Sequence, residues 1–154
     1  MKIKFESIGT YLEREVKIAE TKTIDFAFDS KRFENSMLFV LLGCDIVESP
    51  ETDKFITYLI SLNPVGVAFA GNNARYAWDV LVYLTSIYPS SDHIMTYFTD
   101  EENLVDDLKT MFYAYIPSGD RWDSWTDYLI LCIGDAIQIE NVKAIFRHNF
   151  HHNE

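Results

Sequence analysis

The chain has 154 residues, of which 48% are hydrophobic and 15% aromatic, so it can bury a sizeable core within one domain and is not expected to be disordered. Its formal net charge of −11 disfavours binding to nucleic acid or to anionic membranes, and it suits either plain solubility or a basic protein partner. No apolar run reaches the roughly 18 residues that a membrane-spanning helix needs, and the charged N-terminus lacks the apolar region of a secretory signal, so we expect a cytoplasmic protein.

The N-terminal part of the chain differs in pattern from the rest. The segments EVKIAE (15–20) and TIDFAF (23–28) alternate between apolar and polar residues, which predicts a hairpin or edge strands beside a parallel sheet. We therefore expect a single domain in which residues 1–36 form a strand extension, residues 37–148 form an α/β core and residues 149–154 form a frayed tail.

Four later segments share another pattern, in which a short, continuous apolar run ends in a Gly or an Asp. These segments are MLFVLLGCD (37–45), VGVAFAG (65–71), HIMTYFTD (93–100) and DYLILCIGD (127–135). Continuous apolarity is typical of parallel strands that are buried on both faces, and a helical pattern follows each run. The sequence thus predicts a three-layer α/β fold, Rossmann-like or flavodoxin-like, with a mostly parallel sheet of four core strands and one or two extra N-terminal strands.

The expected helices begin at recognisable capping residues. The predicted caps are Ser49 ahead of Pro50, Asn72 or Asn73, Thr99 paired with Glu102 in a capping box, and Asp135 paired with Gln138. Each cap directly follows one of the apolar runs, so the polar strand ends have a structural explanation that requires no chemistry.

The same strand ends are the places where open α/β sheets bind ligands. The candidate ligand-binding residues are Asp45, Gly71, Asn72, Asn73, Arg75, Thr99, Asp100 and Asp135. A strand followed by Gly71 and a helix start offers backbone N–H groups to an anion, with Arg75 as an added cation. Neither a dinucleotide fingerprint nor a P-loop motif occurs, however, so a structural turn is the main interpretation and an anion site is the alternative.

Converging carboxylates at Asp45, Asp100 and Asp135 suggest a magnesium site, but each also has a capping or turn explanation, and no lysine stands at a later strand end. His148, His151 and His152 have a spacing that zinc sites use, yet no further ligand is evident near the end of the chain. We therefore predict no metal and no cofactor.

Catalytic arrangements are equally hard to assemble from this sequence. No nucleophile-elbow motif is present, and Cys44 and Cys132 lie in apolar runs, where a small buried side chain is the expected role. We predict no catalytic residue.

Two segments carry more exposed aromatic and apolar side chains than a simple fold requires. In the helix predicted after residue 73, Trp78, Val80 and Tyr83 lie outside the narrow polar arc. In the loop spanning residues 116–127, the aromatic and cationic side chains are Arg121, Trp122 and Trp125. Tryptophan and arginine are typical of binding hot spots, so these residues predict an interaction surface, with packing inside the chain as the alternative.

Residues 93–118, HIMTYFTDEENLVDDLKTMFYAYIPS, combine a strand ending in Thr-Asp, an acidic helix start, a Leu-rich helix, an aromatic run and a Pro. In this combination the chain resembles a family of small, uncharacterised bacterial α/β proteins, a domain of unknown function. The resemblance implies a doubly wound fold and brings no catalytic residues.

The leading functional hypothesis is a non-enzymatic protein-interaction module, such as an acidic immunity-like or antitoxin-like protein that binds a basic partner. A small-ligand or nucleotide-binding enzyme that uses the strand-end turns is one alternative. A homodimeric scaffold built on the helix after residue 73 is another.

Overall fold

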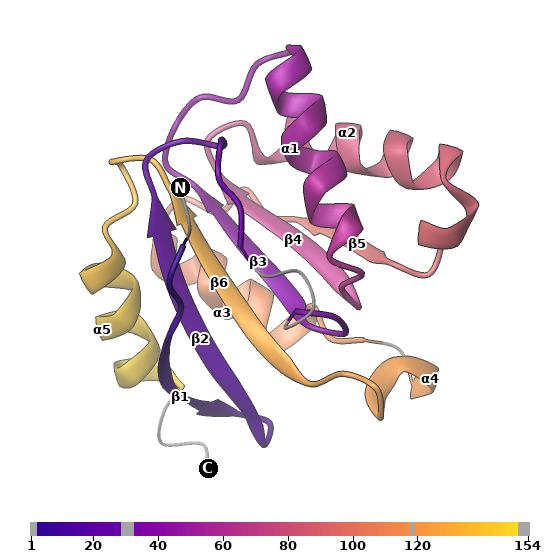
Figure 1. Ribbon diagram of the computed structural model, residues 1–154. Helices are drawn as coiled ribbons and strands as arrows, with labels where there is room; N and C mark the ends of the chain where they lie inside the picture. Colours follow the sequence, from indigo (N-terminus) through magenta and orange to yellow (C-terminus); the bar gives the residue numbers. More distant parts are fainter. Residues whose placement is uncertain (1–2, 29–32, 118, 151–154) are drawn as a thin grey trace.

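The computed structural model describes residues 3–28, 33–117 and 119–150 (Figure 1). The strands are β1 (Glu6–Tyr11), β2 (Arg14–Thr21), β3 (Met37–Leu42), β4 (Gly66–Gly71), β5 (Met95–Phe98) and β6 (Asp127–Ile133). The helices are α1 (Pro50–Ser61), α2 (Ala74–Ile87), α3 (Leu104–Ala114), α4 (Gly119–Trp122) and α5 (Ile139–Asn149), with a short 3-10 helix, η2 (Pro89–Ser91). None of the helices in these ranges has both the length and the apolarity needed to cross a membrane.

All six strands form one sheet in the order β1-β2-β6-β3-β4-β5. Strands β2, β6, β3, β4 and β5 are parallel, and β1 pairs with β2 in the antiparallel sense. The predicted mostly parallel sheet is confirmed, as are its four core strands and its extra N-terminal strands.

Of the two alternatives for residues 15–20 and 23–28, the hairpin between them is wrong, because the hairpin partner of β2 is β1. Residues 15–20 do form a strand beside the parallel sheet, as the other alternative expected. The loop between β1 and β2 consists of Leu12 and Glu13, whose φ angles of 51° and 64° lie in the left-handed region, as tight two-residue hairpin turns require. Asn and Gly are typical of such a turn, and neither occurs at these two positions, so the sequence did not predict it. Segment 23–28 contributes a bridge at Ala27 instead of a strand.

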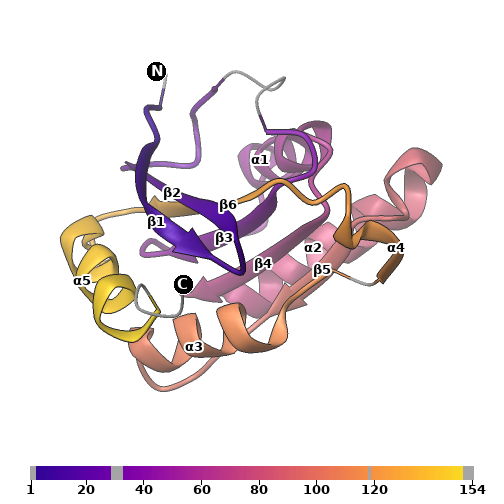
Figure 2. The same cartoon turned by 90° about the horizontal axis from the view of Figure 1, so that it is seen from below.

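The helices cover the two faces of the sheet, so the fold has three layers (Figure 2). Helices α1 and α2 pack against one face, and α3 and α5 pack against the other. Along β3, Leu38, Val40 and Leu42 point to the first face. Met37, Phe39 and Leu41 point to the second. Both faces are therefore buried, which explains why the strand reads as continuously apolar.

The predicted helix caps have mixed outcomes. Ser49 caps α1 as expected, since its side chain accepts a hydrogen bond from the Thr52 N–H. The predictions for Thr99 and Asp135 are wrong: α3 is capped by Asn103, and α5 begins after Gln138. The Thr99 N–H donates to the Phe69 carbonyl and so extends the ladder beyond β5, which leaves Thr99 buried in the sheet instead of at a helix start.

The C-terminal end of the described chain is packed. Phe150, which the sequence pattern assigns to a frayed tail, is fully buried and its ring lies 4.6 Å from that of Phe112. Its apolar ring completes the aromatic cluster beneath α3 and α5. The predicted tail residues His151 and His152 lie outside the described residues.

Strands β3 and β6 are neighbours in the sheet, but the helix that follows β3 lies on one face and the helix that follows β6 lies on the other. This arrangement opens a ligand crevice in many α/β folds. Here the two strand ends are closed against each other. Gly43 donates its N–H to the Ile133 carbonyl at 2.6 Å, and its own carbonyl accepts from Ala136 at 3.2 Å. A Cβ on Gly134 would lie 2.6 Å from the Gly43 backbone, so two glycines bring these backbones into contact and fill the crevice.

We expect Gly134→Ala to destabilise the fold by more than about 2 kcal/mol, because φ at this position is +88° and the added methyl group meets backbone. Urea unfolding followed by circular dichroism measures the effect. Gly119→Ala is the matched control, since a Cβ at Gly119 meets nothing within 4 Å. Equal stability of the two variants would contradict the closed crevice.

Candidate functional site

The strand-end residues do not converge on one centre. Of the predicted ligand-binding set, Gly71, Asn72 and Asp100 line a pocket of about 330 Å³ between the end of β4, the end of β5 and the start of α3. The remaining members lie outside the lining of this pocket: Asp45, Asn73, Arg75, Thr99 and Asp135.

The turn formed by residues 71–73 is a structural joint between strands β4 and β3. The Asn72 N–H donates to the Leu42 carbonyl at 2.8 Å, and the Asn73 side-chain oxygen accepts from the Ile46 N–H at 3.1 Å. Gly71 has a φ of +93°, and a side chain there would collide with Leu42. These groups bind the neighbouring strand and its loop, so the turn makes the contacts expected of a structural joint. The Asn73 side chain holds the loop at Ile46 and makes no capping hydrogen bond to α2.

Acidic side chains dominate the pocket at this turn. Asp107 is buried, and its Oδ1 accepts a hydrogen bond from the Glu101 N–H at 3.0 Å. The pKa of Asp107 is raised to about 6, mainly by burial; hydrogen bonds from the Glu101 backbone and from Thr99 lower it, and the nearby carboxylates of Glu101 and Asp100 raise it. The pocket thus holds a carboxyl group whose pKa is shifted toward neutral pH. No group of metal-ligating side chains occurs within the described ranges.

Exposed acids extend well beyond this pocket, along the edge of the sheet where the parallel strands end. They occupy the loops after β3, β5 and β6 and the first turns of the helices that follow. We call this set the acidic edge: Asp45, Glu48, Glu51, Asp53, Asp100, Glu101, Glu102, Asp106, Asp135 and Glu140. The connection after β4 adds no acid and carries the basic residue Arg75, and Lys143, one residue beyond the first turn of α5, pairs with Glu140 at 3.2 Å. The fold therefore concentrates negative charge at one end of the molecule.

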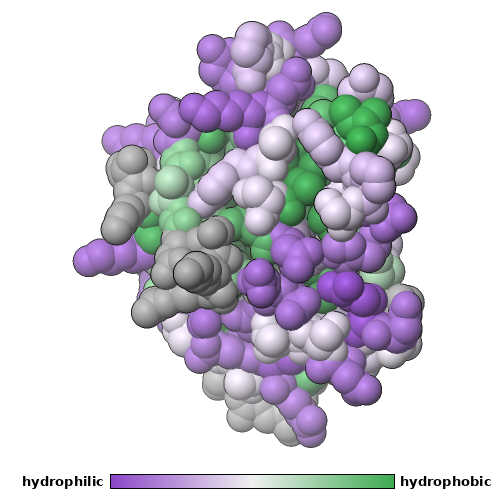
Figure 3. All heavy atoms as spheres, turned by 45° about the vertical axis from the view of Figure 1, so that its right-hand side comes forward, coloured by the Kyte–Doolittle hydropathy of each residue, from purple (hydrophilic) through white to green (hydrophobic). Residues whose placement is uncertain are grey.

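The predicted interaction residues of α2 divide into two groups. Trp78 and Val80 are partly buried against the core, and the Trp78 ring lies 5.1 Å from that of Phe98 in β5. Tyr83 is 63% exposed, and Val82 and Ile87 are exposed near it. Figure 3, which brings the right-hand side of Figure 1 forward, shows hydrophobic surface interrupted by hydrophilic side chains. Packing within the chain accounts for Trp78 and Val80, and a contact through Tyr83 stays a prediction.

The tryptophan loop is similarly divided. Trp125 is only 3% exposed, and its indole N–H donates to the Asp127 carbonyl at 3.0 Å. Trp122 is 37% exposed, and its ring meets that of Trp125 edge-on at 5.4 Å. Arg121 is half-buried and contacts the Asn35 side chain. Trp125 is thus a core residue, and Trp122 is the tryptophan of this loop that a partner can reach.

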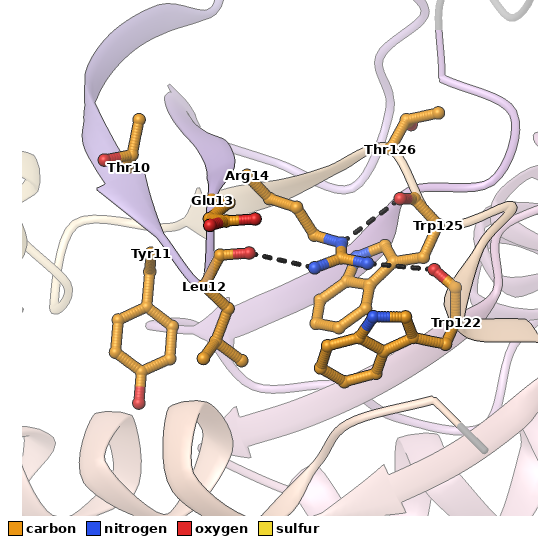
Figure 4. A pocket seen from close by; sticks show the side chains of 8 residues that line it. All are labelled: Thr10, Tyr11, Leu12, Glu13, Arg14, Trp122, Trp125 and Thr126. Atoms are coloured by element: carbon orange, nitrogen blue, oxygen red, sulfur yellow. Dashed lines mark hydrogen bonds between the residues drawn. The ribbon is translucent and has the colours of Figure 1, made fainter. Parts of the chain in front are cut away.

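Sequence reasoning missed the residue that organises this loop, Arg14 at the start of β2. Its guanidinium donates to the backbone carbonyls of Leu12, Trp122 and Trp125 at 2.9, 2.9 and 3.1 Å. Its central carbon lies 4.6 Å from the Trp122 ring centre and 3.9 Å from that of Trp125 (Figure 4). Arg14 lies more than 100 residues from both tryptophans in the sequence, so no local pattern links it to them.

A pocket of about 660 Å³ lies beside this contact, between the hairpin turn and the tryptophan loop (Figure 4). We call it the hairpin groove, and its lining residues are Thr10, Tyr11, Leu12, Glu13, Arg14, Trp122, Trp125 and Thr126. It lies at the end of the sheet where β2 and β6 begin, opposite the acidic edge.

Comparison of the chain with protein-family models, with curated proteins and with solved structures finds no match. The family resemblance of residues 93–118 therefore stays a prediction.

We expect Asp107→Asn to stabilise the protein by about 1–2 kcal/mol at pH 8. This is less than the free energy that corresponds to the whole pKa shift of Asp107, because solvent screens part of the charge. The raised pKa means that the folded state holds the proton more tightly than the unfolded state does. The penalty of the ionised carboxylate therefore grows as pH rises from about 4 to about 6 and is constant above. Thermal unfolding across this range measures it.

The exposed neighbour Asp106 provides the control, since Asp106→Asn should leave the pH profile of the melting temperature unchanged. A wild-type profile that parallels that of Asp107→Asn from pH 4 to pH 8 would show that Asp107 does not titrate in this way.

Proposed function

We propose that this protein is a non-enzymatic interaction module, an acidic immunity-like or antitoxin-like protein that binds and occludes a basic protein partner. The single observation that carries this proposal is the acidic edge, where exposed carboxylates from the three strand–helix connections after β3, β5 and β6 gather at one end of the sheet.

Physical reasoning supports this use of the acidic edge. Like charges gathered on one surface repel each other in the free protein, and a basic partner relieves that repulsion when it binds. The carboxylates stand on loops that are fixed by rigid strand ends, so little ordering is needed on association. Such a surface steers a basic partner into contact and rejects acidic ones.

The test is affinity capture from the native host with the intact chain as bait. We expect recovery of a basic protein at physiological salt, with affinity that falls steeply as salt rises, because exposed charges are screened. Glu102→Lys with Asp135→Lys should weaken this binding at least tenfold.

The control for the charge change is Glu34→Lys with Asp92→Lys, two exposed positions at the other end of the sheet. Each replacement adds two positive charges, so both double variants move from −11 to −7, and only the location differs. Equal weakening by the two variants would show that net charge alone matters, and recovery of no basic protein would contradict the proposal.

A second candidate function is a small-ligand or nucleotide-binding enzyme. It is favoured by the pocket in which Gly71, Asn72 and Asp100 meet beside Asp107, a carboxyl group whose pKa is shifted toward neutral pH. A thermal-shift screen with nucleotides and Mg²⁺ tests it. A rise in melting temperature that Asp100→Ala abolishes would support this candidate, and no shift with any nucleotide would count against it.

A further inference from the structure

The hairpin groove is built with unusual backbone geometry on one wall. Leu12 and Glu13 both hold left-handed φ angles, which β-hairpins normally assign to Asn or Gly. Leu12 nevertheless exposes 38% of its surface at the turn. Strained positions that expose an apolar side chain are common at binding sites, because the surrounding structure holds them in place for a contact.

The opposite wall is fixed by Arg14. Its three hydrogen bonds to backbone carbonyls attach the hairpin turn to the tryptophan loop, and its guanidinium lies against both indole rings (Figure 4). The partly exposed ring of Trp122 then faces the groove across from Leu12 and Tyr11. A groove whose walls are already fixed loses little conformational entropy when it is filled.

Two residues of the groove lining rest on the aromatic core. The ring of the completely buried Tyr128 lies 6.0 Å from that of Tyr11 and 4.9 Å from that of Trp125. This packing holds Tyr11 and Trp125 in place beneath the groove.

Charge selects the kind of occupant. The Arg14 guanidinium already occupies the ring faces of both tryptophans, so a second cation stacked there would meet a like charge. Glu13 lines the groove, so its carboxylate repels an acidic occupant. An apolar side chain between Leu12 and Trp122, with a basic residue next to it that pairs with Glu13, meets all of these conditions.

We propose that the hairpin groove binds an extended segment of the basic partner, with an apolar anchor side chain flanked by Lys or Arg. This inference rests on the proposed function and names a second contact of the same complex. The anchor contacts Leu12 and Trp122, and the flanking cation pairs with the Glu13 carboxylate.

The test follows the indole N–H signals of the three tryptophans by NMR while synthetic pentapeptides are added to the full chain. The probe is Lys-Leu-Lys-Leu-Lys, and the controls are Lys-Ser-Lys-Ser-Lys, which lacks the anchor, and Glu-Leu-Glu-Leu-Glu, which reverses the charge. We expect the Trp122 signal to shift with the probe and not with either control.

Leu12→Gly separates binding from folding, because Gly suits the left-handed turn better than Leu does. We expect this variant to keep or raise the melting temperature and to bind the probe at least tenfold more weakly. Tyr88→Ala, which removes an exposed aromatic ring at the end of α2, should bind as the wild type does.

Unchanged probe binding by Leu12→Gly, or equal shifts with the serine peptide, would overturn the groove proposal. If the probe moves only backbone signals of the acidic edge, the groove proposal fails and the basic-partner proposal stands. If a basic partner is captured and its binding is insensitive to Leu12→Gly, the same conclusion holds.

Discussion

The placement of β6 between β2 and β3 is the constraint on which the rest of this structure depends. Every residue of β6 is buried, and its parallel register with both neighbours fixes where its two ends lie. At its start, the Asp127 carboxylate accepts hydrogen bonds from Ser36, from Thr126 at 3.0 Å and from Lys17 at 3.3 Å. One buried carboxylate thereby connects the N-terminal hairpin, the approach to β3 and the tryptophan loop, and its loss would leave several donors unsatisfied.

The sequence predicted the strands whose both faces are buried, and it failed where pairing was decided over long distances. β3, β4 and β6 were predictable because burial on both sides removes polar residues. β5, a half-buried edge strand, was predicted from its apolar run ending in Thr-Asp. The hairpin partner of β2 was not predictable from the sequence, because the hairpin turns at Leu12 and Glu13. Neither residue is typical of a two-residue turn. The prediction of helix starts failed for a related reason. After β5 the chain has to pass from the sheet to the layer of α3, so α3 begins at Leu104 and not directly after Thr99.

The candidate sites follow the same physical rule. Polar strand ends were visible in the sequence, because a Gly or Asp that interrupts an apolar run is conspicuous, and the acidic edge grows from those positions. The hairpin groove was half visible, through Trp122 and Trp125. Its other half, Leu12 and Arg14, reaches the tryptophans only after β2 pairs with β6, so no local pattern predicts it. What the sequence shows is the composition of a surface, and the register of the sheet decides which residues share it.

The two proposed contacts lie at opposite ends of the same strands, and this separation determines how they act together. The seven residues of β6 span about 23 Å. At physiological salt, charges are screened over about 8 Å, so the acidic edge steers a partner without influencing the groove. An extended segment covers about 3.3 Å per residue, so roughly seven residues of a partner bridge the two contacts. Rising salt should then weaken the contact at the edge, while the apolar contact with Leu12 and Trp122 persists because it depends on burial and not on charge.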